Sequence, residues 1–339
     1  MIFQENVSLC EFNTFKIGGN AKFFCVVRTI DELKEAVIFA KENKLPFFVL
    51  GGGSNTLFRD EGYEGVIIKM EMSGRSIEKK SNNLINLNVT AGEDWDELVN
   101  LTVENNLYGI ENLSGIPGTV GGAAVQNIGA YGAEVRDSII EVEVLDTSDM
   151  VIKTFNNQEC FFYYRDSIFK KSESKKYIVI KVLLRLKKNG RLNTSYKDIK
   201  EYFKDKSANN ISLKELRNAI LEIRSKKFPD LKKFGTAGSF FKNPTVGRKF
   251  YEQLRKKYPQ IPAYAVDENF RIPLAWILDK VCDLKGFKKG KVGLYRNQPL
   301  VLVNFGGASS NDVKKFADEI ARTVKIKIGI NIELEVVFS

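Results

Sequence analysis

Histidine is absent from this 339-residue chain. Its absence excludes every catalytic triad or dyad that depends on an imidazole base, and every metal centre with histidine ligands. Cysteine is scarce as well: Cys10, Cys25, Cys160 and Cys282 are the only ones, and no two form a CxxC pair. We therefore expect no metal site and no disulfide framework, and predict buried or free thiols of a reducing compartment.

Long apolar runs are also missing. The most apolar stretch, YIVIKVLLRL at 177–186, is interrupted by Lys181 and is too short to cross a bilayer. The N-terminus, MIFQENVSLC, has no basic region followed by an apolar run, so no secretory leader is expected. These features predict a cytoplasmic protein without a membrane partner.

What the chain does contain is typical of a globular protein with a large core. It is 43% hydrophobic and 28% charged, and its length predicts two or three domains. The formal net charge of +10 indicates either a lysine-rich surface or attraction to phosphorylated ligands. Because the basic residues form no tail, we do not expect a nucleic-acid partner, whereas anionic small molecules remain candidates.

Hydrophobic periodicity predicts successive units of strand and helix. Strands are predicted at 21–27, 45–50, 66–70, 84–89, 138–147, 151–155, 177–186, 298–305 and 331–339, and helices at 31–44, 91–106, 213–227, 271–282 and 311–324. The strands between 138 and 190 are expected to form an antiparallel sheet. Asp31 is a possible N-cap, Ser212 and Glu215 form a capping box, and Phe228-Pro229 ends the helix that the box begins.

Two glycine clusters stand out. GGGSN at 51–55 follows a predicted strand and is not followed directly by a helix, which excludes a GxGxxG dinucleotide fingerprint. By itself this cluster is either a tight turn or a close approach to a ligand. GIPGTVGGAAVQNIGAYG at 115–132 contains six glycines. An ordered glycine loop with many N–H groups can hold a pyrophosphate, so the two clusters together favour ligand binding.

Three further stretches contain candidate catalytic or binding residues. GTAGSFFKNP at 235–244 places Ser239 on a predicted sharp turn before two phenylalanines. FFYYRDSIFK at 161–170 surrounds Arg165 with aromatic residues, which is costly unless the arginine pairs with an anion; a surface arginine is the alternative. In the predicted terminal strand, Glu333 and Glu335 share one face, which is either an ordinary solvated face or part of a site.

Seven segments, in order, resemble the UDP-N-acetylenolpyruvoylglucosamine reductases, also called UDP-N-acetylmuramate dehydrogenases. They are NTFKIGG (13–19), GGGSN (51–55), IPGTVGGAAVQNIGAYG (116–132), YRDSIFK (164–170), KFPD (227–230), AGSFFKNP (237–244) and LEV (334–336). The resemblance covers nearly the whole chain. TSYKDIKEYF at 194–203 lies where the longer form of the family carries a tyrosine-bearing segment that covers the substrate.

The resemblance implies an α+β protein with an FAD-binding fold of the vanillyl-alcohol oxidase type. Two αβ subdomains would be followed by a C-terminal αβ substrate-binding domain. The expected boundaries are 1–71 for the first subdomain, completed by a C-terminal strand at 328–339, then 72–227 for the second subdomain and 228–327 for the substrate-binding domain. The implied cofactor is non-covalent FAD, with NADPH as co-substrate, and the implied substrate is UDP-N-acetylglucosamine enolpyruvate. A monomer is expected.

The implied reaction reduces an enolpyruvyl ether to a lactyl ether in the synthesis of a peptidoglycan precursor. Ser239 matches the proton donor of the family, Arg165 the group that stabilises developing negative charge, and Glu335 its acidic partner. The implied substrate contacts are Tyr164, Tyr196, Arg224, Lys227, Asn243 and Gln298. The implied FAD contacts are Gly51, Gly52, Gly53, Ser54, Asn55, Gly115, Pro117, Gly118, Gly121, Gly122, Gln126, Asn127, Gly129, Ala130, Tyr131 and Ile178.

Two other functions stay open at this point. Another flavoprotein of the same fold, such as an oxidase or dehydrogenase of a small alcohol, would explain the glycine clusters but not AGSFFKNP, Lys227 or Glu335. A non-catalytic nucleotide-sugar-binding protein that has lost its flavin is the second alternative.

Overall fold

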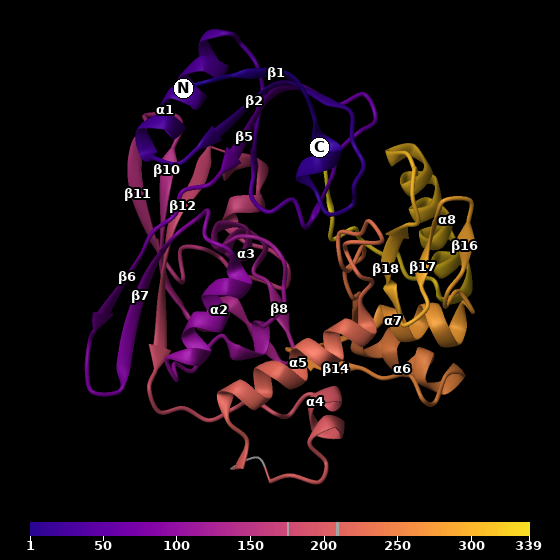
Figure 1. Ribbon diagram of the computed structural model, residues 1–339. Coiled ribbons are helices and arrows are strands. Elements are labelled where there is room, and N and C mark those ends of the chain that lie inside the picture. The colour runs from indigo at the N-terminus through magenta and orange to yellow at the C-terminus, as the bar shows by residue number, and fades with distance from the viewer. Residues whose placement is uncertain (175, 208–209) are drawn as a thin grey trace. The chain divides into compact units, whose positions relative to one another are not determined.

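A computed structural model describes residues 1–174, 176–207 and 210–339, and the chain divides into two compact units (Figure 1). Unit 1 comprises Met1–Val7, Ala21–Gly52 and Glu64–Arg224, and unit 2 comprises Ser8–Asn20, Gly53–Tyr63 and Ser225–Ser339. Each unit encloses its own cluster of buried apolar side chains. The three-part division expected from the sequence is finer than this one and stays a prediction.

The first sheet has four strands in the order β1 (Gln4–Ser8), β2 (Asn20–Val27), β5 (Tyr63–Met70) and β3 (Phe47–Leu50). Helix α1 (Ile30–Glu42) follows β2 and buries Leu33, Ala36, Val37 and Ala40. Its N-cap is Thr29, whose hydroxyl accepts from the N–H of Glu32 at 3.1 Å. The prediction of Asp31 as N-cap is therefore wrong, because Thr29 supplies the acceptor and Asp31 lies inside the first turn.

The second sheet of unit 1 is antiparallel, as predicted for the strands after residue 138. Its order is β11 (Val151–Asn156), β10 (Ile139–Asp146), β12 (Tyr177–Lys187), β7 (Leu84–Thr90) and β6 (Arg75–Lys79). Helices α2 (Trp95–Glu104) and α3 (Val120–Gln126) lie beside this sheet, and α3 contacts β12 and β7 (Figure 1). Strand β6 escaped prediction because all five of its residues are exposed and show no apolar alternation.

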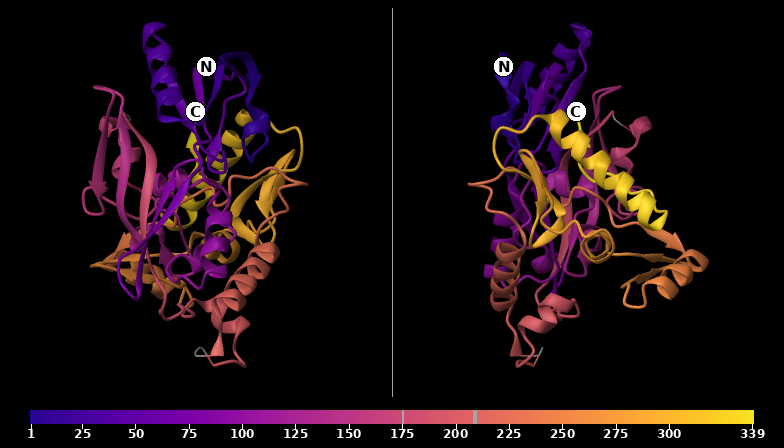
Figure 2. Two further views of the ribbon diagram at one scale, coloured as in Figure 1. Left: turned by 60° about the vertical axis from the view of Figure 1, so that its left-hand side comes forward. Right: turned by 90° about the vertical axis from the view of Figure 1, so that its right-hand side faces the viewer.

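The remainder of unit 1 carries short elements. These are the strands β8 (Gly129–Ala130) and β9 (Ala133–Glu134), the helix α4 (Lys197–Tyr202), and most of α5 (Leu213–Lys227), which extends three residues into unit 2. Figures 1 and 2 show α4 beside α5, and Ile199 packs there with Leu216 and Ile220. The predicted capping box of α5 is confirmed, since the N–H of Glu215 donates to Ser212 Oγ at 3.2 Å.

Unit 2 contains two three-stranded sheets and the longest helix. One sheet has the order β13 (Thr245–Gly247), β15 (Asn269–Arg271) and β14 (Tyr264–Val266), and the other β16 (Lys288–Lys289), β17 (Val292–Tyr295) and β18 (Gln298–Asn304). Helix α8 (Ser310–Ile328) lies along the second sheet and contacts β17 (Figure 2). The other helices are α6 (Arg248–Lys257) and α7 (Leu274–Trp276), which continues as a π-helical turn over Ile277–Val281. Short 3₁₀ turns in the two units span Leu9–Phe12, Glu111–Leu113, Val135–Asp137, Ile168–Lys170 and Ser172–Ser174.

The C-terminal segment differs from the single strand predicted at 331–339. Its regular strand is only β19 (Val337–Phe338), which pairs in parallel with β4 (Thr56–Leu57), whereas Leu334 forms one antiparallel bridge with Phe241. Glu333 is exposed and Glu335 is half-buried. The segment changes its pairing partner between Leu334 and Val337, which breaks the strict alternation expected of one strand.

The four cysteines are free thiols, as predicted. Cys25, Cys160 and Cys282 are buried, and burial raises the pKa of both Cys25 and Cys160 to about 12. In the part of the chain that the structure describes, no group of three or more acidic or cysteine side chains could hold a metal ion. Within the same residues, each helix is too short or too polar to span a bilayer.

The buried carboxylate of Asp146 leads to a prediction of how the stability of unit 1 depends on pH. Its side chain is fully buried and accepts from Lys153 Nζ at 2.6 Å and from the N–H of Ser148 at 2.9 Å. Burial raises the pKa of Asp146, but these bonds outweigh burial and hold it well below the usual carboxyl range. Because the folded pKa is the lower one, this stabilisation is present above about pH 4 and is lost as the pH falls further.

We expect Asp146→Asn to flatten the decline of the urea midpoint between about pH 5 and about pH 2, because the variant has no carboxylate to protonate. Asp149→Asn is the matched control, since Asp149 also binds Lys153, at 2.8 Å, but is exposed. Asp149→Asn should change the pH dependence of the urea midpoint less than Asp146→Asn does. An Asp146→Asn protein with the full acid-induced loss would contradict the assignment.

Candidate active site

Ser239 lies on a segment of unit 2 that is held along both edges. On one side the N–H of Phe240 donates to the carbonyl of Leu300 in β18 at 2.8 Å, and Ser239 forms a bridge with Val301. On the other side the N–H of Lys242 donates to Glu333 O at 2.9 Å. Because the following Phe240 and Phe241 are at most 1% exposed, the backbone around this half-buried serine has little freedom.

The predicted sharp turn before Ser239 is confirmed. Gly238 has φ 74°, a left-handed conformation that favours glycine, and its N–H donates to Thr236 Oγ1 at 3.2 Å. Apart from its chain neighbours, no heavy atom of the described residues lies within 4 Å of the place where a Cβ of residue 238 would stand. The space beside Gly238 is therefore open.

Glu335 is held against the same segment. Its N–H donates to the carbonyl of Phe240 at 2.9 Å, and its own carbonyl accepts from Asn55 Nδ2 at 3.2 Å. Asn55 O in turn accepts from the N–H of Val337 at 3.0 Å. Asn55, the last residue of the GGGSN cluster, thus fixes the backbone of Glu335. That backbone is bonded to Phe240, the residue that follows Ser239.

Three predicted substrate contacts also lie in unit 2. Gln298 begins β18, the strand that pairs with the Ser239 segment, and Lys227 ends α5. A bond of 2.7 Å from Asn297 Nδ2 to Lys226 O joins the neighbours of these two residues. Asn243 accepts the N–H of Leu274 through Oδ1 at 2.9 Å, so its carbonyl oxygen caps α7.

Arg165 lies in unit 1, at the tip of a two-residue turn. Tyr163 and Asp166 close the turn through two backbone bonds of 3.0 and 3.1 Å. Arg165 has φ 55°, which costs a non-glycine residue about 1 kcal/mol. Strain of this kind is retained where the surrounding structure fixes it, and it is found often at active sites.

The guanidinium of Arg165 has two neighbours within unit 1. Nη2 donates to the carbonyl of Gly129, and Cζ lies 5.1 Å from the centroid of the Tyr164 ring. Asn127 is 0% exposed and donates through Nδ2 to Tyr163 O at 2.8 Å. The turn that presents the arginine therefore rests on residues 127–129, within the second glycine cluster.

The two glycine clusters approach each other closely. A Cβ on Gly52 would lie 2.6 Å from Gly118 Cα, and one on Gly51 would lie 2.6 Å from Thr119 Oγ1. Neither contact leaves room for a side chain. The two glycine clusters are thus neighbours in space, and the absence of side chains fits a backbone surface for FAD.

Part of the second cluster is a helix and not the loop that the sequence predicts. Helix α3 begins after its N-cap Thr119, and its first N–H groups already have protein acceptors: Val120 donates to Glu93 O and Gly121 to Ala91 O, both at 2.9 Å, and Gly122 to Thr119 Oγ1 at 3.4 Å. The expectation of a long loop with free N–H groups is wrong for this stretch, because packing of Gly121 against Ala91 favours the helix.

Helix α5 anchors the start of the same cluster. Asp96 accepts the N–H of Gly115 at 2.6 Å and forms a bidentate ion pair with Arg217 at 2.6 and 3.0 Å. Arg224 Nε donates to Gly115 O at 2.9 Å. Burial raises the pKa of Asp96, but Arg217 and the Gly115 N–H outweigh it, so the net pKa is lowered.

Tyr131 and Tyr196 meet beside Arg224. Their ring centroids are 5.4 Å apart at an interplanar angle of 84°, and Arg224 hydrogen-bonds to Tyr131. Burial raises the pKa of the Tyr131 hydroxyl. Two predicted substrate contacts and one predicted FAD contact are thereby brought together within unit 1. The remaining predicted FAD contacts lie in unit 1 at Pro117, Gln126, Ala130 and Ile178, and in unit 2 at Gly53 and Ser54.

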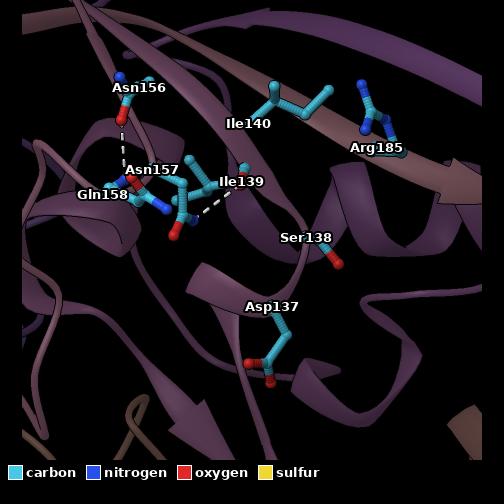
Figure 3. A pocket seen from close by; sticks show the side chains of 8 residues that line it. All are labelled: Asp137, Ser138, Ile139, Ile140, Asn156, Asn157, Gln158 and Arg185. Atoms are coloured by element: carbon cyan, nitrogen blue, oxygen red, sulfur yellow. Dashed lines mark hydrogen bonds between the residues drawn. The ribbon is translucent and has the colours of Figure 1, made fainter.

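A hollow of about 380 Å³ elsewhere on unit 1 contains none of the predicted site residues (Figure 3). It is lined by Asp137, Ser138, Ile139, Ile140, Asn156, Asn157, Gln158 and Arg185. Asn157 Nδ2 donates to Arg136 O and Ile139 O, and Ser138 Oγ donates to Gly109 O, so its polar groups serve the fold.

Neighbouring glycines of α3 give a matched prediction. Alanine at either position favours the helix by up to about 1 kcal/mol. A Cβ on Gly122 meets only Thr119 Oγ1 at 3.5 Å, whereas one on Gly121 meets Ala91 Cβ at 2.7 Å. We expect Gly122→Ala to keep or raise the free energy of unfolding in urea, and Gly121→Ala to lower it by about 1–3 kcal/mol. Equal changes in the free energy of unfolding for the two variants would show that Ala91 can move aside without a cost in stability.

Sequence reasoning missed residues that hold the site in place. The sequence did not predict Asp96 and Arg217 as residues that support the site, because their ion pair joins two helices across 121 positions of the chain. Lys170 ends the YRDSIFK segment that carries the family resemblance, but only the structure shows where its ammonium group binds.

Comparison with known proteins places these features in context. Residues 21–154 match the family described as FAD binding domain, and residues 230–339 match that described as UDP-N-acetylenolpyruvoylglucosamine reductase, C-terminal domain. The chain is 40% identical over 342 residues to the UDP-N-acetylenolpyruvoylglucosamine reductase of Flavobacterium johnsoniae, covering 99% of both chains. It is 38% identical over 333 residues to that of Pseudomonas aeruginosa, covering 98% of this chain and 97% of the other. The crystal structure of the Thermus caldophilus reductase matches with a TM-score of 0.68, 25% identity and 99% coverage of both chains.

Proposed function

The chain belongs to the UDP-N-acetylenolpyruvoylglucosamine reductase family, and we propose that it carries out this reduction with Ser239, Arg165 and Glu335 as its catalytic residues. The predictions of family, fold class, flavin-dependent oxidoreductase activity and FAD as cofactor are confirmed. The observation that supports the assignment of residues best is the bond from Glu335 N to Phe240 O, which fixes Glu335 beside the Ser239 segment.

The proposed substrate is UDP-N-acetylglucosamine enolpyruvate, and the product is UDP-N-acetylmuramate, a peptidoglycan precursor. FAD, when bound, would supply the hydride chemistry that links NADPH to the vinyl carbon of the substrate. Negative charge then develops on the adjacent carbon and its carboxylate. The chain itself must stabilise that charge and deliver a proton to that carbon.

Ser239 is proposed to deliver the proton. The chain contains no histidine, so its proton donors are hydroxyls, thiols, ammonium and guanidinium groups, and protonated carboxyls. A hydroxyl is a weak acid, but the developing carbanion is a strong base, so transfer from Ser239 remains favourable. General acid catalysis of this kind contributes about 10²–10⁴-fold. The open space next to Gly238 provides the room that a substrate needs beside this hydroxyl.

Arg165 and Glu335 are proposed to act on the carboxylate side of the reacting group. The guanidinium supplies fixed positive charge where negative charge develops, and a donor of this kind contributes about 10²–10³-fold. Its position is set in advance by Gly129 O and Tyr164, so little reorganisation is needed during the reaction. Glu335 serves as the acidic partner, on a backbone fixed by Asn55 and Phe240.

The remaining predicted contacts would bind the nucleotide and the sugar. Lys227 and Gln298 lie next to residues joined by the Asn297–Lys226 bond, and an ammonium group there can pair with a pyrophosphate. Tyr164, Tyr196, Arg224 and Asn243 complete the proposed substrate set. The glycine clusters at 51–55 and 115–132 would hold FAD through their backbones, since the close approach at Gly52 and Gly118 excludes side chains.

Anaerobic stopped-flow measurement of flavin absorbance tests this function. We expect NADPH to reduce the flavin, and the enolpyruvyl sugar nucleotide to reoxidise the reduced enzyme rapidly. Reoxidation by oxygen alone would favour another flavoprotein of the same fold. A colourless protein that FAD cannot reconstitute would favour a non-catalytic nucleotide-sugar-binding protein.

The proposal extends to location and assembly. A cytoplasmic enzyme suits the four free thiols, because disulfides are rare in that compartment. We also propose that the enzyme acts as a monomer, which light scattering of the FAD-loaded protein tests directly.

A further inference from the structure

Lys170 makes two bonds that the proposed mechanism leaves unused. Its ammonium group donates to Gln126 Oε1 at 2.8 Å and to the backbone carbonyl of Arg165 at 3.0 Å. The side chain is half-buried. One end of this link is the last residue of α3, a predicted FAD contact, and the other is the backbone of the proposed catalytic arginine.

The second bond acts on a strained part of the chain. Arg165 stands in the left-handed region, at a turn position where glycine is favoured. The backbone there would relax unless it were held, and a relaxed turn would carry the guanidinium away from its place. Lys170 holds the peptide that follows Arg165, because its Nζ binds the carbonyl oxygen of that peptide.

Other bonds of the same segment also end on residues 125–129. Ser167 Oγ donates to Val125 O at 2.6 Å, and Asn127 Nδ2 donates to Tyr163 O at 2.8 Å. The guanidinium of Arg165 itself donates to Gly129 O. Lys170 differs from Ser167 and Asn127 because its ammonium group contacts the backbone of Arg165 itself and adds a positive charge, which strengthens both of its bonds.

We propose that Lys170 is a positioning residue for the reaction: it locks the backbone of Arg165 to Gln126 and so fixes the guanidinium where negative charge develops. This inference rests on the proposed function of Arg165. Lys170 acts through Arg165 and needs no contact with substrate. A small displacement of a catalytic group is enough to cost roughly 10²-fold in rate.

The test compares the two half-reactions of the FAD-loaded enzyme by anaerobic stopped-flow. Lys170→Met keeps an unbranched side chain of similar length and removes the donors. We expect it to slow reoxidation by the enolpyruvyl sugar nucleotide by roughly 10–10²-fold, while flavin reduction by NADPH changes less than about 3-fold. Lys170→Arg retains donors and should recover most of the lost rate. It also serves as the informative variant if the methionine protein fails to fold.

Lys171→Met is the matched control. Lys171 is the next residue, and its ion pair with Asp166 at 2.6 Å lies on the surface, with 51% of the lysine side chain exposed. We expect both half-reactions to stay within about 3-fold of the parent, because exposed ion pairs contribute little. An equal loss in Lys171→Met and Lys170→Met would overturn the proposal.

A double variant separates positioning from general structural damage. In an Arg165→Ala background, Lys170→Met should cause no further slowing of reoxidation, because the group it positions is gone. The inference would be overturned if Arg165→Ala and Lys170→Met slow reoxidation by independent factors that multiply in the double variant. Equal slowing of both half-reactions by Lys170→Met alone would also overturn it. If Arg165→Ala itself leaves reoxidation unchanged, the proposed function of Arg165 fails as well. If only Lys170→Met leaves it unchanged, the positioning role alone fails.

Discussion

Replacement of Ser239 by alanine is expected to leave flavin reduction by NADPH unchanged and to slow flavin reoxidation by the enolpyruvyl sugar nucleotide by about 10²–10⁴-fold. The serine is held through backbone pairing with β18, so alanine can occupy the same position without disturbing Phe240. The variant therefore removes the proton donor and little else. Anaerobic stopped-flow of each half-reaction measures the effect.

Ser309→Ala is the control for a serine of unit 2 that serves stability alone. Its hydroxyl accepts the N–H of Asp312 at 3.0 Å and caps α8. We expect a loss of about 1 kcal/mol in the free energy of unfolding, with both half-reactions preserved. If Ser239→Ala slows both half-reactions equally, Ser239 is not the general acid and its role is to maintain the site.

Arg165→Ala and Arg165→Gly are both expected to slow reoxidation by about 10²–10³-fold, because each removes the guanidinium that stabilises developing charge. They should differ in stability. Residue 165 has φ 55°, so glycine relieves strain that alanine retains, and the glycine variant should unfold with a free energy about 1 kcal/mol higher than the alanine variant. Stopped-flow and urea unfolding of the same two proteins measure both effects.

Together, Arg165→Ala and Arg165→Gly separate the effect of residue 165 on catalysis from its effect on stability. A glycine variant that is more stable and equally slow would show that the strain at Arg165 is retained for function. Equal stability of the two variants would contradict a left-handed backbone at residue 165. Retention of fast reoxidation in both would remove Arg165 from the catalytic set.

The helices and strands that follow a clear hydrophobic period were predictable from the sequence. Strands β2, β7, β10 and β12 and helices α2 and α8 lie where alternation or helical spacing indicates them. Helix α6 was not predicted, because it is strongly basic and buries only Leu254. The glycine-rich α3 was also missed, because tertiary packing of Gly121 against Ala91 overrides the low helix propensity of glycine.

The candidate site likewise contains some features that were predictable from the sequence and others that were not. The left-handed turn at Gly238, directly before Ser239, follows from GTAGSFFKNP. The partners of Glu335 do not, because Asn55 reaches it across 280 positions of sequence. The same holds for Lys170, since spacing along the chain does not reveal which carbonyl an ammonium group will bind.

Long-range bonds around the serine also bear on how the protein folds. Thr14 Oγ1 donates to Thr236 O at 2.6 Å across 222 positions, and Asn304 Nδ2 donates to Phe15 O at 3.1 Å across 289. Contacts of such high contact order form late, because a large loop must close before they contribute any stabilisation. We therefore expect refolding to restore the β10–β12 region before it restores activity, with turnover recovering in the slowest phase.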